Sequence, residues 1–278
     1  MKTFRKALQR AGFPITAEIS LCKQTTVDEA MKQAGVMAGS VDAIQVAESP
    51  DGSARVAPHA LASLLISQGI DVIPRMHCRD RNRIALQSDL LGLRALGVSS
   101  LILNKGNQLP TGKELSGKAV FELSCRELIA MAHAMNEEEW SDGDHELVIG
   151  TEATAFAPAT GWKAESLQAR SAAGARFLQT QPCFDLDLLR RYMQGLVEAR
   201  LTWSYSVIVT LAPLHSADTE QEGIEICAEL MREAALIPGV SGINLLTLGN
   251  PGAVVAAINA SGLPPDDIQP CQHQDNHQ

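Results

Sequence analysis

The organisation of the chain is clearest in the stretch Arg176-Phe177-Leu178-Gln179-Thr180-Gln181-Pro182-Cys183-Phe184-Asp185. Its first half has the short apolar pattern of a buried strand, and Pro182 ends that pattern just before a helix that is expected to begin near Asp185. A strand that passes directly into a helix is the repeating unit of a parallel sheet. The stretch therefore indicates a fold built from βα units.

Two glutamines, Gln179 and Gln181, stand at the end of this expected strand. A glutamine amide both donates and accepts hydrogen bonds, so a pair at a strand end could bind the polar edge of a heterocycle. Alternatively, the two amides could only satisfy neighbouring backbone groups. The spacing alone favours neither reading.

Strand patterns of this kind recur along the chain and are separated by segments with apolar residues at helical spacing. The expected strands are residues 15–20, 43–48, 72–77, 99–104, 146–151, 176–181, 206–211 and 242–247. The expected helices include residues 26–38, 57–68, 82–96, 126–135, 185–199 and 220–235. Alternation of this kind, with no break in composition, predicts an α/β protein with a closed (β/α)8 TIM barrel rather than an open sheet.

At 278 residues the chain has the length of one such barrel. We expect residues 1–263 to form a catalytic barrel domain and the polar residues 264–278, with His273 and His277, to form a disordered tail. Two connections are long. Residues 105–124 follow the fourth strand, at the end of a barrel that carries active sites, whereas the acidic residues 136–145 lie on the opposite face.

Composition excludes several classes of partner. The net charge is -9 and the basic residues are scattered, which argues against nucleic-acid binding. No apolar run reaches membrane-spanning length and no signal-peptide pattern follows the basic N-terminus, so we expect a cytoplasmic protein without a membrane partner. The six cysteines form no Cys-x-x-Cys pair, which argues against a zinc knuckle or a redox dithiol. Most should be small packing residues in the core. Cys22, Cys78 and Cys183 closely follow strands, so a reactive thiol near the site is the alternative for these three.

In a barrel, the polar groups at the strand ends converge on one mouth and form the candidate site. These groups are Glu18, Glu48, His77, Asn104, Lys105, Gly106, Asn107, Glu152, Gln179, Gln181, His215 and Asn244. Their types and spacing do not match a metal site, so no catalytic metal is expected.

Glu18 is the strongest candidate for a general acid. It lies in an otherwise apolar strand, where desolvation would raise the pKa of its carboxyl. Two alternatives compete with this role. Glu18 could be a structural glutamate paired with Arg75 or Arg79, and Glu48 could be the acid on the same reasoning.

Several blocks of the sequence together resemble the methylenetetrahydrofolate reductase family, in the family's order, from about Thr16 to Pro264. They are Ala17-Glu18-Ile19-Ser20, Asp42-Ala43-Ile44-Gln45-Val46, Cys78-Arg79-Asp80-Arg81-Asn82-Arg83-Ile84-Ala85-Leu86-Gln87-Ser88-Asp89-Leu90, Ala173-Gly174-Ala175-Arg176-Phe177 and Gln179-Thr180-Gln181-Pro182-Cys183-Phe184-Asp185. The resemblance implies a (β/α)8 barrel, in agreement with the strand pattern. It also implies an oxidoreductase that interconverts 5,10-methylenetetrahydrofolate and 5-methyltetrahydrofolate with NADH or NADPH, usually through FAD.

The resemblance also assigns roles to individual residues. Glu18 falls at the family's general acid, which protonates N10 of the folate so that the five-membered ring opens to an iminium. Gln181 falls at the glutamine that contacts the pterin, and Gln179 and Asn107 are assigned to the substrate site with it. The positions implied for cofactor binding are His77, Asn104, Lys105, Gly106, Glu152 and Arg170.

The flavin positions match the family less well. After the fourth strand, members have Gly-Asp-Pro or Arg-Gly-Asp, whereas Asn107 stands here where the aspartate is expected. Arg170 replaces a lysine, and Glu152 and Phe156 fall in a loop where some members have tyrosine and histidine. The lost charge would favour a reduced anionic flavin. Either FAD is bound with a raised potential, which would ease oxidation of methyltetrahydrofolate, or flavin is absent and NAD(P)H passes hydride directly to the folate.

Two other functions stay open at this point. A catalytically silent family member could act as a folate-binding subunit or sensor, which Asn107 favours and the retained Glu18 and Gln181 oppose. An unrelated barrel could use Glu18 and Lys105 for aldol-type chemistry, with a Schiff base on Lys105. No Gly-x-Gly-x-x-Gly pattern is present, so the nicotinamide nucleotide is expected at the barrel mouth. The sequence leaves open NADH or NADPH, the direction of the reaction and a homo-oligomeric state.

Overall fold

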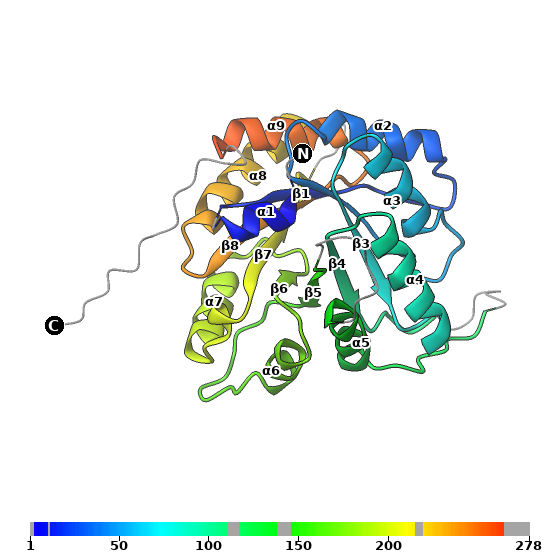
Figure 1. The fold of residues 1–278 in the computed structure, drawn as a ribbon. Coiled ribbons are helices and arrows are strands. Elements are labelled where there is room, and N and C mark those ends of the chain that lie inside the picture. The colour runs from blue at the N-terminus through cyan, green and yellow to red at the C-terminus, as the bar shows by residue number, and fades with distance from the viewer. Residues whose placement is uncertain (1–2, 11, 111–116, 138–145, 215–218, 264–278) are drawn as a thin grey trace.

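Eight parallel strands close into a barrel, in which each strand pairs with the next and β8 pairs with β1 (Figure 1). The computed structural model describes residues 3–10, 12–110, 117–137, 146–214 and 219–263. The strands are β1 (Ile15–Glu18), β2 (Ala43–Val46), β3 (Val72–His77), β4 (Ser100–Asn104), β5 (Val148–Ala153), β6 (Phe177–Thr180), β7 (Ser206–Leu211) and β8 (Val240–Leu246). The expected (β/α)8 barrel is confirmed.

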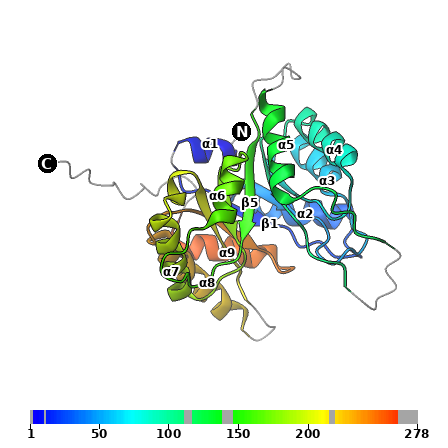
Figure 2. The ribbon, with the colours of Figure 1, turned by 90° about the horizontal axis from the view of Figure 1, so that it is seen from below.

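Helices surround the barrel and alternate with its strands (Figures 1 and 2). Those described are α1 (Phe4–Gln9), α2 (Val27–Met37), α3 (Pro58–Ser67), α4 (Arg83–Ala95), α5 (Cys125–Glu137), α6 (Glu165–Ala172), α7 (Leu186–Glu198), α8 (Glu220–Ala235), α9 (Pro251–Ser261) and the short 3-10 helix η1 (Leu201–Trp203). The helices named from the sequence are confirmed with small differences at their ends. α9 packs against both α2 and α8, so the last βα unit meets the first.

Side-chain caps explain where two of these helices begin. Asp185 precedes α7, and its carboxylate accepts a hydrogen bond from the backbone N–H of Leu188 at 2.9 Å. This confirms the helix start expected after Pro182. At α2, Thr26 and Glu29 exchange hydrogen bonds with each other's backbone N–H groups, which together form a capping box.

One strand boundary changes the interpretation of the site. The fifth strand was expected at residues 146–151, but β5 runs from Val148 to Ala153. Glu152 therefore belongs to the strand and not to the loop after it. In β5 its partner across the ladder is Gln179 of β6, which fixes the position of its side chain far better than a loop would.

The amino-terminal end of the barrel is closed by α1 and an apolar layer. Phe4 packs edge-on against Phe177 with ring centroids 5.0 Å apart. Both rings belong to a buried cluster with Ala43, Ile73, Ile102 and Ile208. The backbone N–H of Phe4 also donates to Asp71 Oδ2 at 2.8 Å, which holds the helix in place.

Above this apolar layer lies a buried polar one. Gln45 and Gln179 exchange side-chain hydrogen bonds of 2.7 and 3.0 Å, and Gln45 Nε2 also donates to Thr16 Oγ1 at 3.0 Å. Thr16 in turn donates to Asn244 Oδ1 at 2.9 Å. Asn244 is fully buried in this layer, so its expected place among the groups at the mouth was wrong.

Some expectations fall on residues that lie outside the described ones. They are residues 111–116 of the long connection after β4, residues 138–145 before β5, His215, and the tail with Cys271, His273 and His277.

Candidate active site

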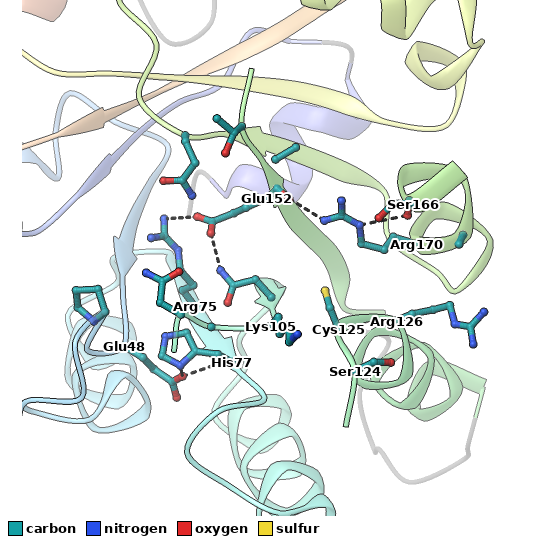
Figure 3. Close-up of a pocket in the computed structure, with 18 residues that line it drawn as sticks. Glu48, Arg75, His77, Lys105, Ser124, Cys125, Arg126, Glu152, Ser166 and Arg170 are labelled. Carbon is teal, nitrogen blue, oxygen red and sulfur yellow. Dashed lines mark hydrogen bonds and ion pairs between the residues drawn. The ribbon is translucent and has the colours of Figure 1, made fainter. Parts of the chain in front are cut away.

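Two adjoining cavities open at the carboxyl ends of the strands. The larger, here called the outer lobe, has a volume of about 960 Å³, and its lining includes Lys105, Asn107, Arg126 and Arg170. Figure 3 shows this lobe, with Lys105, Arg126 and Arg170 among the labelled side chains. The smaller, the inner lobe, has a volume of about 290 Å³ and is lined by Glu18, Ser20, Arg55, Gln179 and Thr210. Both lobes are bordered by Glu48, Pro50, Arg75, Glu152 and Gln181.

A largely buried charge cluster marks the boundary between the lobes. Arg75 Nη2 donates to Glu18 Oε2 at 2.7 Å and lies 3.0 Å from Glu152 Oε1. Asn104 Nδ2 donates to the second oxygen of Glu152 at 2.5 Å. In Figure 3 the side chains of Arg75 and Glu152 point toward one another across the mouth. The cluster joins β1, β3, β4 and β5, because side chains of alternate residues in each strand face the barrel axis.

The environment of Glu18 favours its protonated form. Burial raises the pKa of its carboxyl, the charge of Arg75 acts against this rise, and the nearby Glu152 carboxylate adds to it. The expected pairing with Arg75 is present. Pairing with Arg79 is not, since the fully buried Arg79 binds Asp80 and the carbonyls of Ser49 and Pro50.

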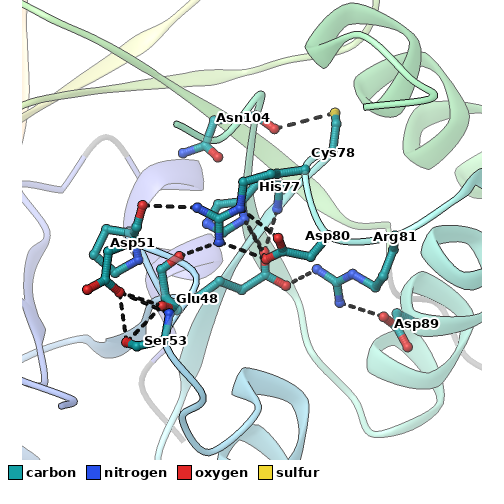
Figure 4. Close-up of polar contacts among 12 residues, drawn as sticks. Glu48, Asp51, Ser53, His77, Cys78, Asp80, Arg81, Asp89 and Asn104 are labelled. Carbon is teal, nitrogen blue, oxygen red and sulfur yellow. Dashed lines mark hydrogen bonds and ion pairs between the residues drawn. The ribbon is translucent and has the colours of Figure 1, made fainter. Parts of the chain in front are cut away.

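A second charge cluster lies beside the first and engages Glu48 (Figure 4). Glu48 Oε2 accepts from the backbone N–H of His77 at 2.7 Å and lies 2.8 Å from His77 Nδ1, while Oε1 pairs with Arg81. Burial, followed by the charge of Arg79, lowers the pKa of His77 to about 4, so His77 is neutral at neutral pH. Glu48 is therefore less free than Glu18 to exchange a proton with a ligand.

Glu48, His77 and Asp80 place possible metal-ligand atoms within 4.8 Å of one another. Each of the two carboxylates is already paired with an arginine, Glu48 with Arg81 and Asp80 with Arg79. The positive charges that a metal ion would provide are thus supplied by the chain itself. That the site uses no metal stays a prediction.

Comparison with known families identifies the chain. The profile of the family described as methylenetetrahydrofolate reductase matches residues 3–227. The chain belongs to the methylenetetrahydrofolate reductase family. The resemblance seen in the sequence is thereby confirmed, and with it a folate-related reductase family.

Solved structures similar to this member of the reductase family share only its fold. A 2,3-dimethylmalate lyase of the PEP mutase/isocitrate lyase superfamily is 16% identical with a TM-score of 0.53, covering 92% of this chain and 83% of its own. An oxaloacetate acetylhydrolase is 14% identical with a TM-score of 0.53, covering 93% and 84%. Tryptophan synthase from M. tuberculosis is 12% identical with a TM-score of 0.56, covering 94% and 97%. The search of curated proteins returned no matching relative.

The structure brings together most residues that the reductase family's pattern selects. Glu18, Gln179 and Gln181 line the inner lobe, and His77, Asn104, Lys105, Gly106, Asn107, Glu152 and Arg170 line the outer lobe. Gln181 is exposed and borders both lobes, whereas Gln179 is buried and hydrogen-bonded to Gln45. Of the two glutamines, Gln181 is therefore the one available to a ligand, and Gln179 satisfies a neighbouring side chain.

The loop after β4 borders the outer lobe through Lys105, Gly106 and Asn107. Gly106 has φ +82°, and a Cβ there would lie 2.9 Å from His77 Cβ, so only glycine lets this loop pack on β3. Lys105 is exposed, with its Nζ 5.7 Å from the centre of the Phe121 ring. A Schiff-base lysine needs a desolvated pocket, so this position does not support the aldol-type alternative. Asn107 is exposed at the rim.

Arg170 of α6 is fixed against β5. Its Nη1 donates to Thr151 Oγ1 at 2.9 Å and to the carbonyl of Glu152 at 2.7 Å. Phe156, placed in the same region by the family pattern, packs instead on Trp162 and Tyr192, with ring centroids 5.2 and 5.5 Å away. Arg170 therefore braces the strand that carries Glu152, and Phe156 has a packing role.

Among the residues of the outer lobe that sequence reasoning missed are Ser124, Cys125, Arg126 and Ser166. The first three lie at the start of α5, which follows the long connection after β4. A helix that follows a barrel strand begins on the mouth side of the barrel. The expected helix start at residue 126 could therefore have been used to predict that the first residues of this helix line the mouth.

The free cysteines are mostly packing residues, as expected. Cys78 and Cys183 are buried, and burial raises the pKa of both thiols, in the case of Cys78 to about 12. Cys22 is exposed outside both lobes. Cys125 borders the outer lobe, where burial again raises its pKa. A nucleophilic cysteine needs both a lowered pKa and a position inside the site, and none of these four thiols combines the two.

In the part of the chain that the structure describes, no helix is both long enough and apolar enough to cross a bilayer.

Proposed function

We propose that this protein interconverts 5,10-methylenetetrahydrofolate and 5-methyltetrahydrofolate with NAD(P)H as the hydride partner. The observation that carries the proposal is the shared position of Glu18 and Gln181 on the inner lobe. A carboxyl whose pKa is raised by burial can donate a proton to a folate, and an exposed amide beside it can form hydrogen bonds with the pterin.

In the reducing direction, Glu18 gives its proton to N10 of the folate, and the bond from N10 to the bridging carbon breaks. The iminium carbon then accepts a hydride, giving methyltetrahydrofolate and NAD(P)+. One proton and one hydride are consumed, so the step balances. In the oxidising direction the hydride leaves first, and Glu18 takes the proton from N10 as the ring closes.

The outer lobe supports the binding of the nicotinamide nucleotide. Lys105 and Arg126 line it, and lysine and arginine pair well with phosphate oxygens. The lobe adjoins the inner one along Arg75, Glu152 and Gln181, so a nicotinamide ring at this border would face the folate. Close approach of the two reacting rings is what direct hydride transfer needs.

The same cations would fit the pyrophosphate of FAD, so the residues present fit either dinucleotide. Bound flavin would supply a relay that accepts the hydride and passes it to the folate. We favour direct transfer in this protein, because Asn107 lacks the charge expected beside a flavin and Arg170 is committed to Thr151 and the Glu152 carbonyl.

The central test is Glu18→Gln, assayed for NAD(P)H oxidation with methylenetetrahydrofolate and for NAD(P)+ reduction with methyltetrahydrofolate. The variant should lose turnover by about 10²-fold or more while nucleotide binding, followed by fluorescence, stays intact. Glu48→Gln is the matched control, and it should lose far less. Equal losses in both variants would remove Glu18 from its role.

The flavin question is tested by the colour of the purified protein. Direct transfer predicts full activity in a colourless protein. A yellow protein, with flavin released on denaturation at near-equal stoichiometry, would contradict it.

A catalytically silent folate-binding subunit or sensor is the second candidate, favoured by Asn107 at the rim. It predicts measurable binding of methyltetrahydrofolate by calorimetry but no exchange of hydride with either nucleotide. Turnover with NADH or NADPH rules it out.

A further inference from the structure

The charge cluster at the border of the lobes contains one cation and two carboxyl groups. A single nitrogen of Arg75, Nη2, lies within 3.0 Å of both Glu18 and Glu152. The three side chains are only 17%, 17% and 11% exposed for Arg75, Glu18 and Glu152. Two ionised carboxylates here would leave a net negative charge in a poorly solvated place, so one of them is expected to keep its proton.

The hydrogen bonds distinguish the two carboxyl groups. Glu152 faces two donors, because Arg75 lies at one oxygen and Asn104 Nδ2 donates to the other at 2.5 Å. For the Glu18 side chain, the donor found among the described residues is Arg75. Donors stabilise a carboxylate over its acid, so the negative charge belongs on Glu152 and the proton on Glu18.

We propose that Glu152 is a positioning residue for the proposed reaction: it holds a fixed negative charge on Arg75 and so keeps the reacting proton on Glu18. This inference rests on the proposed function for its catalytic meaning. It explains how a glutamate that contacts an arginine can still serve as an acid, since Glu152 occupies the same guanidinium nitrogen. The raised pKa of Glu18, caused first by its burial and in part by Glu152, agrees with this geometry.

The other charged groups around Glu18 have their own partners. On the β2 side, Glu48 is held by Arg81 and His77, and His77 is neutral. Arg55, which lines the inner lobe, pairs with Asp51 at 3.5 Å.

Around Glu18 itself, β2 contributes the uncharged Gln45, β6 contributes Gln179, the residue after β6 is Gln181, and β8 contributes Leu246. Glu152 and Arg75 are thus the described charges best placed to set the ionisation of Glu18.

The first test compares the pH dependence of kcat/KM in the unaltered enzyme and in Glu152→Gln. Removing the carboxylate removes a like charge and leaves Arg75 to Glu18 alone, and both effects favour ionised Glu18. In the profile of kcat/KM against pH, the limb that reports the ionisation of Glu18 should move by about one pH unit or more toward lower pH. This shift is expected for the reaction in either direction. A merely structural residue would lower the rate without moving this limb. Glu48→Gln is the control, and its limb should stay in place.

The second test needs no turnover. Infrared difference titration of the ligand-free protein, with Glu18→Gln as the reference, follows the protonated carboxyl band of Glu18. Its midpoint should fall in Glu152→Gln, and fall less in Asn104→Ala, which keeps the carboxylate but removes one of its donors. Asn104→Ala also serves if Glu152→Gln does not fold.

The two ideas can fail separately. An unaltered protein that does not turn over folate overturns the proposed function, while the infrared titration still decides the role of Glu152. An unchanged infrared midpoint in the variants overturns the inference even if the enzyme is active. An equal shift in Glu48→Gln also overturns it, because the effect would then be general to charge at the mouth.

Discussion

The ring of Phe177 lies directly over Gly150 inside the barrel. A Cβ added to Gly150 would lie 2.2 Å from Phe177 Cζ, a distance that requires the ring or β5 to move. Gly150→Ala should therefore destabilise the protein by roughly 2 kcal/mol, within the range typical of an overpacked core. Urea unfolding measures this loss.

Gly92→Ala is the control for this substitution. Gly92 lies in α4, and its added Cβ would meet no atom within 4 Å, so alanine should be neutral or stabilising by up to about 1 kcal/mol. Pairing Gly150→Ala with Phe177→Leu should recover part of the lost stability. A Gly150→Ala protein as stable as the unaltered one would show that this layer is not tightly packed.

Arg75 should be needed for stability in a pH-dependent way. Arg75→Met leaves Glu18 and Glu152 without their shared cation, so protonation becomes the remaining way to neutralise them. The folded-state pKa of Glu18, which burial already raises, would then rise further, and the stability tied to its protonation is lost as pH rises through that value. Loss of one partner from a buried ion pair costs about 3 to 5 kcal/mol.

Urea unfolding of Arg75→Met at pH 5 and at pH 8 measures this effect. The loss of stability relative to the unaltered protein should be larger at pH 8. An equal loss at both values would mean that Arg75 contributes through the packing of its alkyl chain.

Substitution of Gln181 should affect folate binding, whereas substitution of Gln179 should affect stability, although both residues belong to one strand pattern. Gln181 is exposed at the border of the lobes, so Gln181→Ala should raise the KM for folate about 3- to 10-fold, the effect of one hydrogen bond, and leave the melting temperature nearly unchanged. Gln179 exchanges two hydrogen bonds with the buried Gln45, so Gln179→Ala should lower the melting temperature. Equal effects of both on KM would place the pterin deeper in the barrel than we propose.

The fold could be predicted from the sequence because buried residues recur with the spacing typical of each helix and strand. The apolar runs around Phe177 and Ile208 are buried on both faces, which is the pattern that parallel strands share. The short helix α1 was missed, since its six residues carry one buried side chain, Phe4, and no periodic stripe.

The site was only partly accessible. Glu18 and Gln181 stand out because they are polar at the ends of apolar strands, and family blocks surround them. The contacts of Glu152 with Arg75 and Asn104 could not be predicted from the sequence. They join three strands and depend on a strand boundary two residues away from the expected one. Registers between strands far apart in sequence are set by tertiary packing and not by local pattern.

Asn107 gives a test of the lost charge at the rim. Asn107→Asp adds a carboxylate to an exposed position of the outer lobe. If flavin binds, this charge should disfavour the reduced anion and lower the flavin potential, or improve the retention of FAD during purification. Reconstitution with FAD followed by a redox titration measures both. Asn107→Ala, which adds no charge, is the control, and an unchanged potential with unchanged retention would show that the charge at this position does not matter.

Asp71 at the base of the barrel should make stability depend on pH. Burial raises the pKa of its carboxyl to about 6, although the backbone N–H of Phe4 donates to it. Since the unfolded-state pKa is lower, the unfolded chain releases this proton first as pH rises. The stability that Asp71 contributes is therefore fully present below about pH 4, and it is lost between about pH 4 and pH 6, by roughly 3 kcal/mol at most.

Asp71→Asn should flatten this part of the urea-midpoint profile, whereas Asp28→Asn, at an exposed aspartate of α2, should leave it unchanged. A profile that keeps its slope in Asp71→Asn would assign the pH dependence to other carboxyl groups, such as Asp42, which lies close enough to raise the pKa of Asp71.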